Sequence, residues 1–211
     1  MGYAVTINGK QIHADTNERH IKMRKITVSE FVSLDGVMED PGGSEKSSFG
    51  GWTLGYWNDE IGKFKYDELF AADALLLGRM TYEGFAAAWP KAEGTGDFGE
   101  RMNSIAKYVV SSSLKQADWT NSHILKANAV EEITRLKQQD GKDILVGGSA
   151  TLIQTLIAHD LVDSYRLLIY PVVLGGGKRL FKDGTKTDLK LIEAKSVGAG
   201  VVAMIYEPDR K

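Results

Sequence analysis

The stretch ALLLGRMTYEGF, residues 74–85, changes from the pattern of a buried strand to that of a helix within a few positions. The run of Ala and Leu between Asp73 and Gly78 is typical of a short strand covered on both faces. After Gly78, the apolar residues recur at loosely helical spacing. Free N–H groups at the start of a helix attract anions, and a glycine lets another molecule approach the backbone closely. The stretch therefore predicts an anion-binding turn between a strand and a helix.

The alternation of strand and helix patterns continues on both sides of this stretch. We predict strands at residues 24–32, 73–78, 107–112, 122–126, 142–147, 162–173, 188–197 and 200–207. We predict helices at residues 59–70, 79–88, 129–139 and 149–158. The last two strands are joined by GAG at 198–200 without a helix, so the sheet should be mixed and end in an antiparallel hairpin. The fold class predicted by these patterns is an α/β sandwich.

The composition of the chain limits its class and its partners. The 211 residues are 43% hydrophobic and 26% charged, which predicts one domain with a sizeable core. A formal net charge of −2 gives no general attraction to nucleic acid or to anionic lipid, so neither partner is expected. The chain has no cysteine and its four histidines are scattered, so disulfides, thiol catalysis and a metal site are not expected. No signal peptide or membrane-spanning segment is recognisable, and we expect a cytoplasmic protein.

The first 22 residues differ from the rest of the chain. The segment VTINGKQI, residues 5–12, has two short alternating runs around Asn8-Gly9, which predicts a β-hairpin. We interpret residues 1–22 as an N-terminal extension, either a leader or an appended hairpin, with Met23 as an alternative start. The main domain then covers residues 23–211.

Two later strand ends have the chemistry of a nucleotide site. In DILVGGSATLIQTLI, a strand runs into Gly147-Gly148 and then Ser149 at the start of a helix, which predicts a cradle the size of a diphosphate. The alternative is a tight turn with an ordinary N-cap serine. In KYVVSSSLKQ, the strand ends in Ser111 and Ser112, whose hydroxyls either hold a ribose or simply form the polar exit of the strand.

The order of these motifs resembles the cofactor site of the dihydrofolate reductase fold. Together with VSLDGVMEDPGG and YPVVLGGGKRLF, they make residues 24–207 similar to the reductase domain of the riboflavin pathway's bifunctional deaminase-reductase. The resemblance implies a dihydrofolate reductase-like three-layer sandwich on a mainly parallel eight-stranded sheet, with NADPH as cofactor. Proper dihydrofolate reductases have a pterin-binding carboxylate early in the first helix, and Gly62 lies near its place here, which weakens the case for folate.

The resemblance also implies a set of cofactor-binding residues. It places Arg79 beside the 2′-phosphate, which suits a guanidinium, with an ion pair to Glu83 as the structural alternative. It implies a cis bond between Gly147 and Gly148. The implied cofactor-binding set is Gly78, Arg79, Thr81, Ser111, Ser112, Gly147, Gly148, Ser149, Ala150 and Thr151.

The substrate end is expected in the long glycine-rich loop of residues 33–58. Trp52 and Trp57 there either cover a nicotinamide and stack on a planar substrate, or only anchor the loop. The resemblance adds Gly176 to this substrate-binding set. The proton that accompanies hydride transfer comes from Asp35, Asp59, Glu60 or water, and the sequence does not choose among them.

The function expected from these features is that of an NADPH-dependent reductase acting on a small, heterocyclic substrate. Two alternatives stay open: a non-catalytic nucleotide-binding or sensing protein, and a reductase that uses a flavin-type cofactor. A homodimer is also expected, because the strand in VDSYRLLIYPVVLG and the last hairpin would leave apolar surface uncovered in a monomer.

Overall fold

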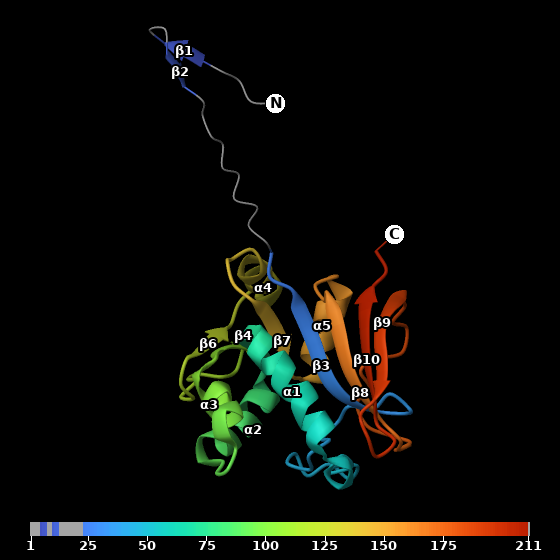
Figure 1. Cartoon of the computed structure of the whole chain (residues 1–211). Helices are drawn as coiled ribbons and strands as arrows, with labels where there is room; N and C mark the ends of the chain where they lie inside the picture. Colours follow the sequence, from blue (N-terminus) through green and yellow to red (C-terminus); the bar gives the residue numbers. More distant parts are fainter. Residues whose placement is uncertain (1–4, 8–9, 13–22, 211) are drawn as a thin grey trace.

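The computed structural model describes residues 5–7, 10–12 and 23–210 (Figure 1). Two short strands, β1 (Val5–Ile7) and β2 (Lys10–Ile12), pair antiparallel, which confirms the strands of the expected hairpin. Its Asn8-Gly9 turn lies outside the described residues. The division of the chain into residues 1–22 and 23–211 stays a prediction.

The main domain is built on an eight-stranded sheet with the order β6-β5-β4-β7-β3-β8-β10-β9. Its strands are β3 (Ile26–Ser33), β4 (Ala72–Gly78), β5 (Ala106–Val110), β6 (Ser122–Leu125), β7 (Asp143–Val146), β8 (Ser164–Tyr170), β9 (Leu189–Ser196) and β10 (Val202–Pro208). Of these strands, β10 alone runs in the opposite direction to the other seven, so both of its pairings, with β8 and β9, are antiparallel. The mixed sheet with a terminal hairpin is therefore confirmed. Strand β8 stops before Pro171, which has no N–H to donate to a ladder.

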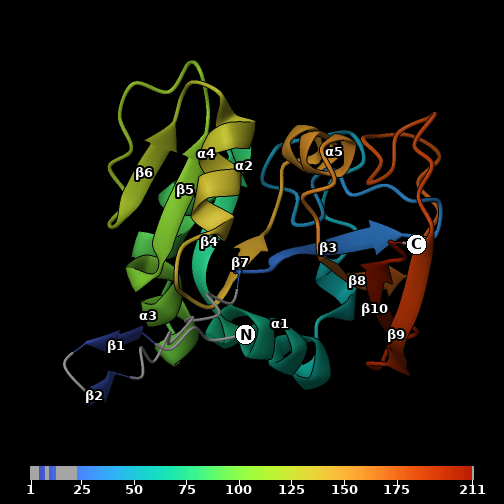
Figure 2. The same ribbon diagram turned by 90° about the horizontal axis from the view of Figure 1, so that it is seen from above.

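Helices cover both faces of this sheet and make three layers (Figure 2). They are α1 (Asp59–Ala71), α2 (Arg79–Ala88), α3 (Gly96–Ser104), α4 (Ala129–Lys137) and α5 (Ala150–Ala158), with short 3₁₀ turns η1 (Leu54–Tyr56) and η2 (Trp89–Lys91). Helices α1, α2 and α3 pack on one face, and α4 and α5 pack on the other. No helix among residues 23–210 has the length and apolar character that crossing a bilayer would require.

Helix α3 was not predicted from the sequence. Its segment GDFGERMNS contains two glycines, which favour a loop reading. The helix forms because Phe98 and Met102, four residues apart, both pack into the cluster between α1, α2 and the sheet. Gly99 is required by close packing, because a Cβ there would lie 2.9 Å from the Cβ of Thr95. Tertiary burial therefore overrides the local preference of this segment.

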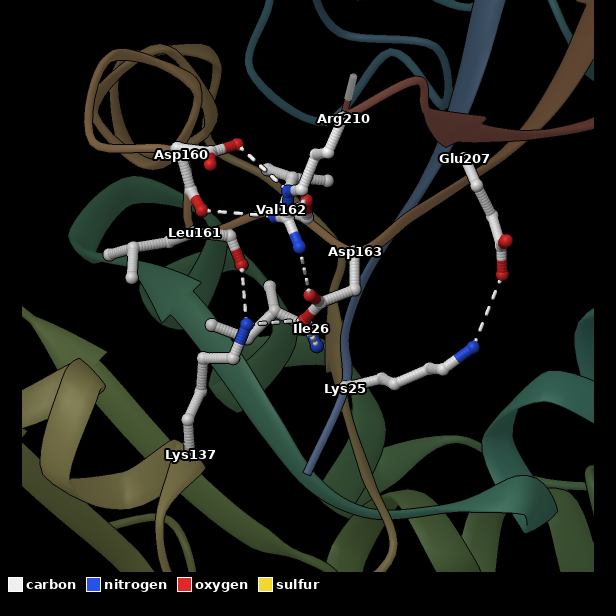
Figure 3. A network of polar contacts seen from close by, with 9 residues as sticks. All are labelled: Lys25, Ile26, Lys137, Asp160, Leu161, Val162, Asp163, Glu207 and Arg210. Atoms are coloured by element: carbon white, nitrogen blue, oxygen red, sulfur yellow. Dashed lines mark hydrogen bonds and ion pairs between the residues drawn. The ribbon is translucent and has the colours of Figure 1, made fainter. Parts of the chain in front are cut away.

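The chemistry differs between the two ends of the parallel strands. We call the end where these strands begin the amino edge and the end where they finish the carboxyl edge. At the amino edge, the Asp163 carboxylate accepts hydrogen bonds from the Ile26 N–H at 2.8 Å and from Lys137 Nζ at 2.5 Å (Figure 3). Arg210 adds a third bond at 3.3 Å and also reaches Asp160. This group ties α4, β3, β8 and the end of the chain together. The carboxyl ends of the parallel strands, where ligands bind in open α/β sheets, lie at the opposite edge.

Candidate active site

The ends of β4 and β7 meet at the carboxyl edge through glycine backbone. The Gly78 N–H donates to the Gly148 carbonyl oxygen at 3.1 Å. A Cβ on Gly78 would lie 3.0 Å from the Ser149 Cβ, and a Cβ on Gly148 would lie 2.8 Å from the Thr81 hydroxyl. Gly148 also has a φ of +100°, which other residues rarely adopt. The structure therefore brings together four members of the predicted cofactor-binding set in a contact that only glycines permit.

Two helices begin at this contact. Gly78 is the N-cap of α2 and Ser149 is the N-cap of α5, and no described side chain caps either helix. Ser149 was expected to cap α5 with its hydroxyl, but its Oγ makes no such bond. The uncapped first-turn N–H groups of the two helices, which for α5 include those of Ala150 and Thr151, form a site with positive potential at one place.

The cis peptide expected at this turn is one bond further along the chain. The sequence resemblance implied a cis bond between Gly147 and Gly148, whereas the structure has it between Gly148 and Ser149. Gly147 is half-buried and Gly148 is buried, so the turn itself lies where it was expected.

Arg79 lies in the first turn of α2 and forms an ion pair with Glu83. Its Nη1 lies 2.9 and 3.1 Å from the two carboxylate oxygens. The two side chains are 41% and 43% exposed, so the pair is accessible to solvent and weak. An anion that offers the guanidinium a bidentate partner could replace Glu83 at small cost. The ion pair and a phosphate-binding role are therefore compatible.

Strand β5 ends beside β4, because Gly78 pairs with Val110 in the register. Ser111 follows directly and is buried, and its Oγ accepts the N–H groups of Ser113 at 3.2 Å and Leu114 at 2.9 Å. That hydroxyl holds the turn after the strand. Ser112 is exposed at the same edge, and its hydroxyl is the freer of the two for a ribose.

One hollow of about 600 Å³ opens between α2 and residues 114–120. Glu83, the ion-pair partner of Arg79, lies on its wall, and the buried rings of Tyr82 and Trp119 contribute apolar surface. The hollow therefore adjoins the Arg79 end of the site.

Asp35 lies in the turn after β3 and holds a second loop in place. Its carboxylate accepts the Ser33 hydroxyl at 2.6 Å and the N–H groups of Leu174 at 3.1 Å and Gly175 at 2.8 Å. These hydrogen bonds lower its pKa to about 2, so the group is ionised at neutral pH. The structure thus brings Asp35 to the carboxyl edge, where it fixes the glycine-rich loop near Gly176.

Asp59 and Glu60 lie in the first turn of α1 and are exposed. Asn58 caps the helix by accepting the N–H groups of Glu60 at 2.9 Å and Ile61 at 3.1 Å. The same side chain donates to the Val197 carbonyl at 3.0 Å, which fixes the helix start against the β9–β10 hairpin. Both carboxylates face solvent in this arrangement.

The long loop before α1 has an internal structure. Asp40 is buried and its carboxylate accepts the N–H groups of Glu45 and Ser47, both at 2.9 Å. Within the predicted substrate-binding set, Gly176 lies against Phe49, because a Cβ there would approach the Phe49 ring to 2.8 Å. Trp57 is 61% exposed. Part of the long glycine-rich loop is therefore organised around the Asp40 carboxylate.

Trp52 of this loop points inward to Tyr170, a residue that the sequence analysis did not single out. Its indole Nε1 donates to the Glu39 carbonyl at 3.0 Å, and its ring meets the Tyr170 ring edge-on at 5.4 Å. Tyr170 is completely buried, and burial raises the pKa of its phenol far above the usual range. The continuous apolar run LLIY at 167–170 indicates that Tyr170 is buried, but nothing local in the sequence predicts its neighbours.

Buried charges on β3 and α1 were also missed. Glu68 is buried on α1, accepts a hydrogen bond from Ser29 and forms an ion pair with Lys65, and Arg166 Nε lies 3.4 Å from its other oxygen. Glu30 lies on the opposite face of β3, where burial raises its pKa to about 8. An acidic residue inside an apolar strand or helix is the sequence signal that could have identified Glu30 and Glu68.

Comparisons with known proteins show the family of this chain. The family model described as the RibD C-terminal domain matches residues 24–203. YyaP of Bacillus subtilis (strain 168), named as uncharacterised, is 33% identical over 191 residues, which cover 89% of this chain and 96% of that protein. The chain belongs to the RibD C-terminal domain family.

Solved structures share the fold. A protein of Shewanella sp. PV-4, described as a riboflavin biosynthesis protein, superimposes with a TM-score of 0.67 at 19% identity, covering 88% of this chain and 99% of that one. Dihydrofolate reductase of Enterococcus faecalis, solved in complex with NADP(H) and RAB-propyl, gives a TM-score of 0.57 at 15% identity, covering 88% of this chain and 96% of that one. The sheet and its helices are therefore those of a dihydrofolate reductase-like protein.

Proposed function

We propose that this member of the RibD C-terminal domain family is an NADPH-dependent reductase acting on a small heterocyclic substrate. Membership of the family supports a reductase-type function. The single observation that carries the proposal is the meeting of the α2 and α5 N-termini at Gly78 and Gly148, without a side-chain cap on either helix. Backbone N–H groups and two positive dipole ends at one place suit a diphosphate.

The residues around this meeting point fit the rest of a phosphorylated dinucleotide. Arg79 would hold the 2′-phosphate in exchange for Glu83, and Ser112 would contact the adenosine ribose. Gly78 and Gly148 would keep the two helix starts close enough to face one diphosphate, since a Cβ at either position would run into Ser149 or Thr81. A bound nicotinamide would supply the hydride, and this chain's residues would orient the two reactants and exclude water.

The proton required by the reaction is assigned by elimination within this proposal. Asp35 is a poor acid, because its pKa of about 2 leaves it ionised and its oxygens already hold Leu174 and Gly175. We assign it the role of a positioning residue for the glycine-rich loop. Asp59, Glu60 or water would then deliver the proton from the solvent side of α1.

The test is a comparison of cofactors followed by a turnover screen. Thermal unfolding is measured with NADPH, NADH, FMN and FAD, and carbonyl, imine and pterin compounds are then screened for loss of NADPH absorbance. Stabilisation by NADPH together with turnover of a heterocycle is expected. NADPH binding without any turnover would favour a non-catalytic nucleotide-binding protein, and binding of a flavin alone would favour a flavin-type reductase.

A cytoplasmic homodimer is part of the same proposal. The support for pairing is strand β9 at the sheet edge, where Leu191 and Ile192 are about half exposed. A second copy would cover this apolar edge by two-fold symmetry. Light scattering at micromolar concentration should give about twice the 23.2 kDa mass of one chain, and a mass near that of one chain would contradict it.

A further inference from the structure

Tyr170 carries a buried hydroxyl without a hydrogen-bond partner. It is the last residue of β8 and pairs with Ser33 in the register, so it lies at the carboxyl edge of the sheet. Its side chain is fully buried, and its Oη contacts no donor or acceptor among the described residues. A Phe at this place would fill the same space without leaving a polar group unpaired. Packing alone therefore does not account for the hydroxyl.

The surroundings of Tyr170 are aromatic. The rings of Phe31, Trp52 and Tyr56 meet it edge-on, with centroids 5.7, 5.4 and 5.5 Å away. We call these four residues the aromatic cage. The four rings fill this space in the structure, so their flat apolar surfaces and the Tyr170 hydroxyl meet a ligand only when part of the cage moves. A flat ring with an acceptor in its plane matches both features.

Two of the cage rings belong to residues 52–57, of which Thr53 alone is buried, with its hydroxyl donating to the Pro41 carbonyl at 2.7 Å. Trp52 and Tyr56 flank Leu54, which is 69% exposed, and Trp57 follows at 61% exposed. The inward rings are fixed by the Trp52 bond to Glu39 and by a 3.2 Å bond from Asn58 Nδ2 to the Tyr56 carbonyl. A segment with so little buried surface opens at lower free energy than the strands beneath it.

We propose that Tyr170 is a substrate-contacting residue of the reductase site. A planar heterocycle enters the aromatic cage when residues 52–57 lift, and its ring nitrogen or carbonyl oxygen accepts a hydrogen bond from the Tyr170 hydroxyl. The neutral phenol donates to an acceptor, so flat compounds without one bind more weakly. This inference rests on the proposed function, because it makes the cage the substrate end of that site.

The first test compares two Tyr→Phe variants in unfolding by urea. Tyr82 is also buried, but its hydroxyl accepts the Trp119 N–H at 3.0 Å. Tyr82→Phe should lower the unfolding midpoint because it leaves that N–H unpaired, whereas Tyr170→Phe should leave it unchanged or raise it. A loss in Tyr170→Phe as large as that in Tyr82→Phe would show that the hydroxyl serves the fold, and would overturn the proposal.

The second test uses isoquinoline and naphthalene, flat probes of equal size of which only the first has a ring acceptor. Binding is followed by Trp fluorescence at neutral pH without cofactor. The wild type should bind isoquinoline about fivefold more tightly, as expected for one hydrogen bond, and Tyr170→Phe should bind the two equally. Trp52→Phe should remove most of the fluorescence response, which places the probe in the cage. A preference that survives in Tyr170→Phe, or no saturable response to either probe, would overturn the proposal.

The failure of this inference can be told apart from the failure of the proposed function. Both tests omit the cofactor, and NADPH binding is measured separately on the wild type and on Tyr170→Phe. If the protein discriminates between the probes but does not bind NADPH, the cage is a heterocycle-binding site and the proposed reductase function is wrong. If the protein binds NADPH and turns over substrate, but Tyr170→Phe leaves KM unchanged, the proposed role of Tyr170 is wrong and the reductase function stands.

Discussion

The amino edge of the sheet and its carboxyl edge use opposite means of joining strands. At the amino edge, charged side chains close the structure: Asp163 is shared by Lys137, Arg210 and a backbone N–H (Figure 3). At the carboxyl edge, Gly78 and Gly148 join β4 to the start of α5 with no side chains between them. At the amino edge, the polar groups bind one another and stabilise the fold. At the carboxyl edge, the N–H groups at the starts of α2 and α5 have no side-chain caps and are available to a ligand.

The largest expected effect is on stability at the amino edge. Asp163→Ala removes the acceptor of a largely buried ion pair, in which the side chains of Asp163 and Lys137 are 15% and 10% exposed. The uncompensated Lys137 should lower the free energy of unfolding by about 3 kcal/mol, measured in urea. The control is Asp160→Asn, because Asn tolerates the φ of +51° at this position and the Asp160 side chain is 74% exposed. Its expected loss is below about 1 kcal/mol. Equal losses of stability in the two variants would show that the buried Asp163 ion pair contributes no more to the fold than the exposed Asp160 pair.

The next effect concerns cofactor choice at the carboxyl edge. Arg79→Ala should weaken NADPH binding by about tenfold to a hundredfold, from the loss of charge-assisted bonds worth about 1.5–3 kcal/mol, and leave NADH nearly unchanged. Calorimetry of both cofactors measures it. Glu83→Ala is the matched control, because it frees the guanidinium and should leave NADPH binding as tight or tighter. An unchanged NADPH-to-NADH ratio in Arg79→Ala would contradict a 2′-phosphate site.

A smaller effect is expected from the glycine contact itself. Gly78→Ala places a methyl group 3.0 Å from the Ser149 Cβ, so it should cost about 1–3 kcal/mol of stability and also weaken NADPH binding. Gly84→Ala in the same helix meets no atom within 4 Å and should raise stability by about 0.5–1 kcal/mol without affecting binding. If both substitutions change stability and NADPH binding equally, the close approach of β4 and α5 does not require glycine at position 78.

The smallest effect should appear only in acid. The pKa of Asp35 is lowered from 3.8 to about 2 by the Ser33 hydroxyl and the Leu174 and Gly175 N–H groups. Its ionised form therefore stabilises the fold above about pH 3.8, and this contribution is lost as the pH falls through about 2. The difference in urea midpoint between the wild type and Asp35→Asn should shrink over that range. A difference independent of pH would mean that the carboxylate charge does not hold the loop.

Much of the fold and part of the site follow from local pattern. The change of period at residues 74–85 indicates β4 and α2 because burial on both faces of a strand and on one face of a helix imposes different spacings. Gly78 and Gly148 are recognisable because turns and close backbone approaches require glycine. Helix α3 was missed because its two glycines weigh against a helix, and only contacts with other elements decide in its favour.

The partners of functional side chains do not follow from local pattern. Asp35 reads as a turn residue in SLDG, yet its oxygens bind N–H groups at positions 174 and 175. The serines after β5 look alike in sequence, but folding uses the Ser111 hydroxyl to close its own turn and leaves Ser112 exposed. Each role depends on an atom supplied by a distant segment or on a turn formed only once the strand is placed.

Apart from α3, the sequence by itself determined the order of strands and helices and the positions of the glycine turns, because periodicity and backbone freedom are properties of a few neighbouring residues. The tertiary structure decided that α2 and α5 start at the same point, that Asp163 binds three segments, and that the Tyr170 hydroxyl has no partner among the described residues. A hydrogen bond needs two partners, and a side chain is buried only when other segments cover it. Both are fixed only when strands far apart in the chain become neighbours in the sheet.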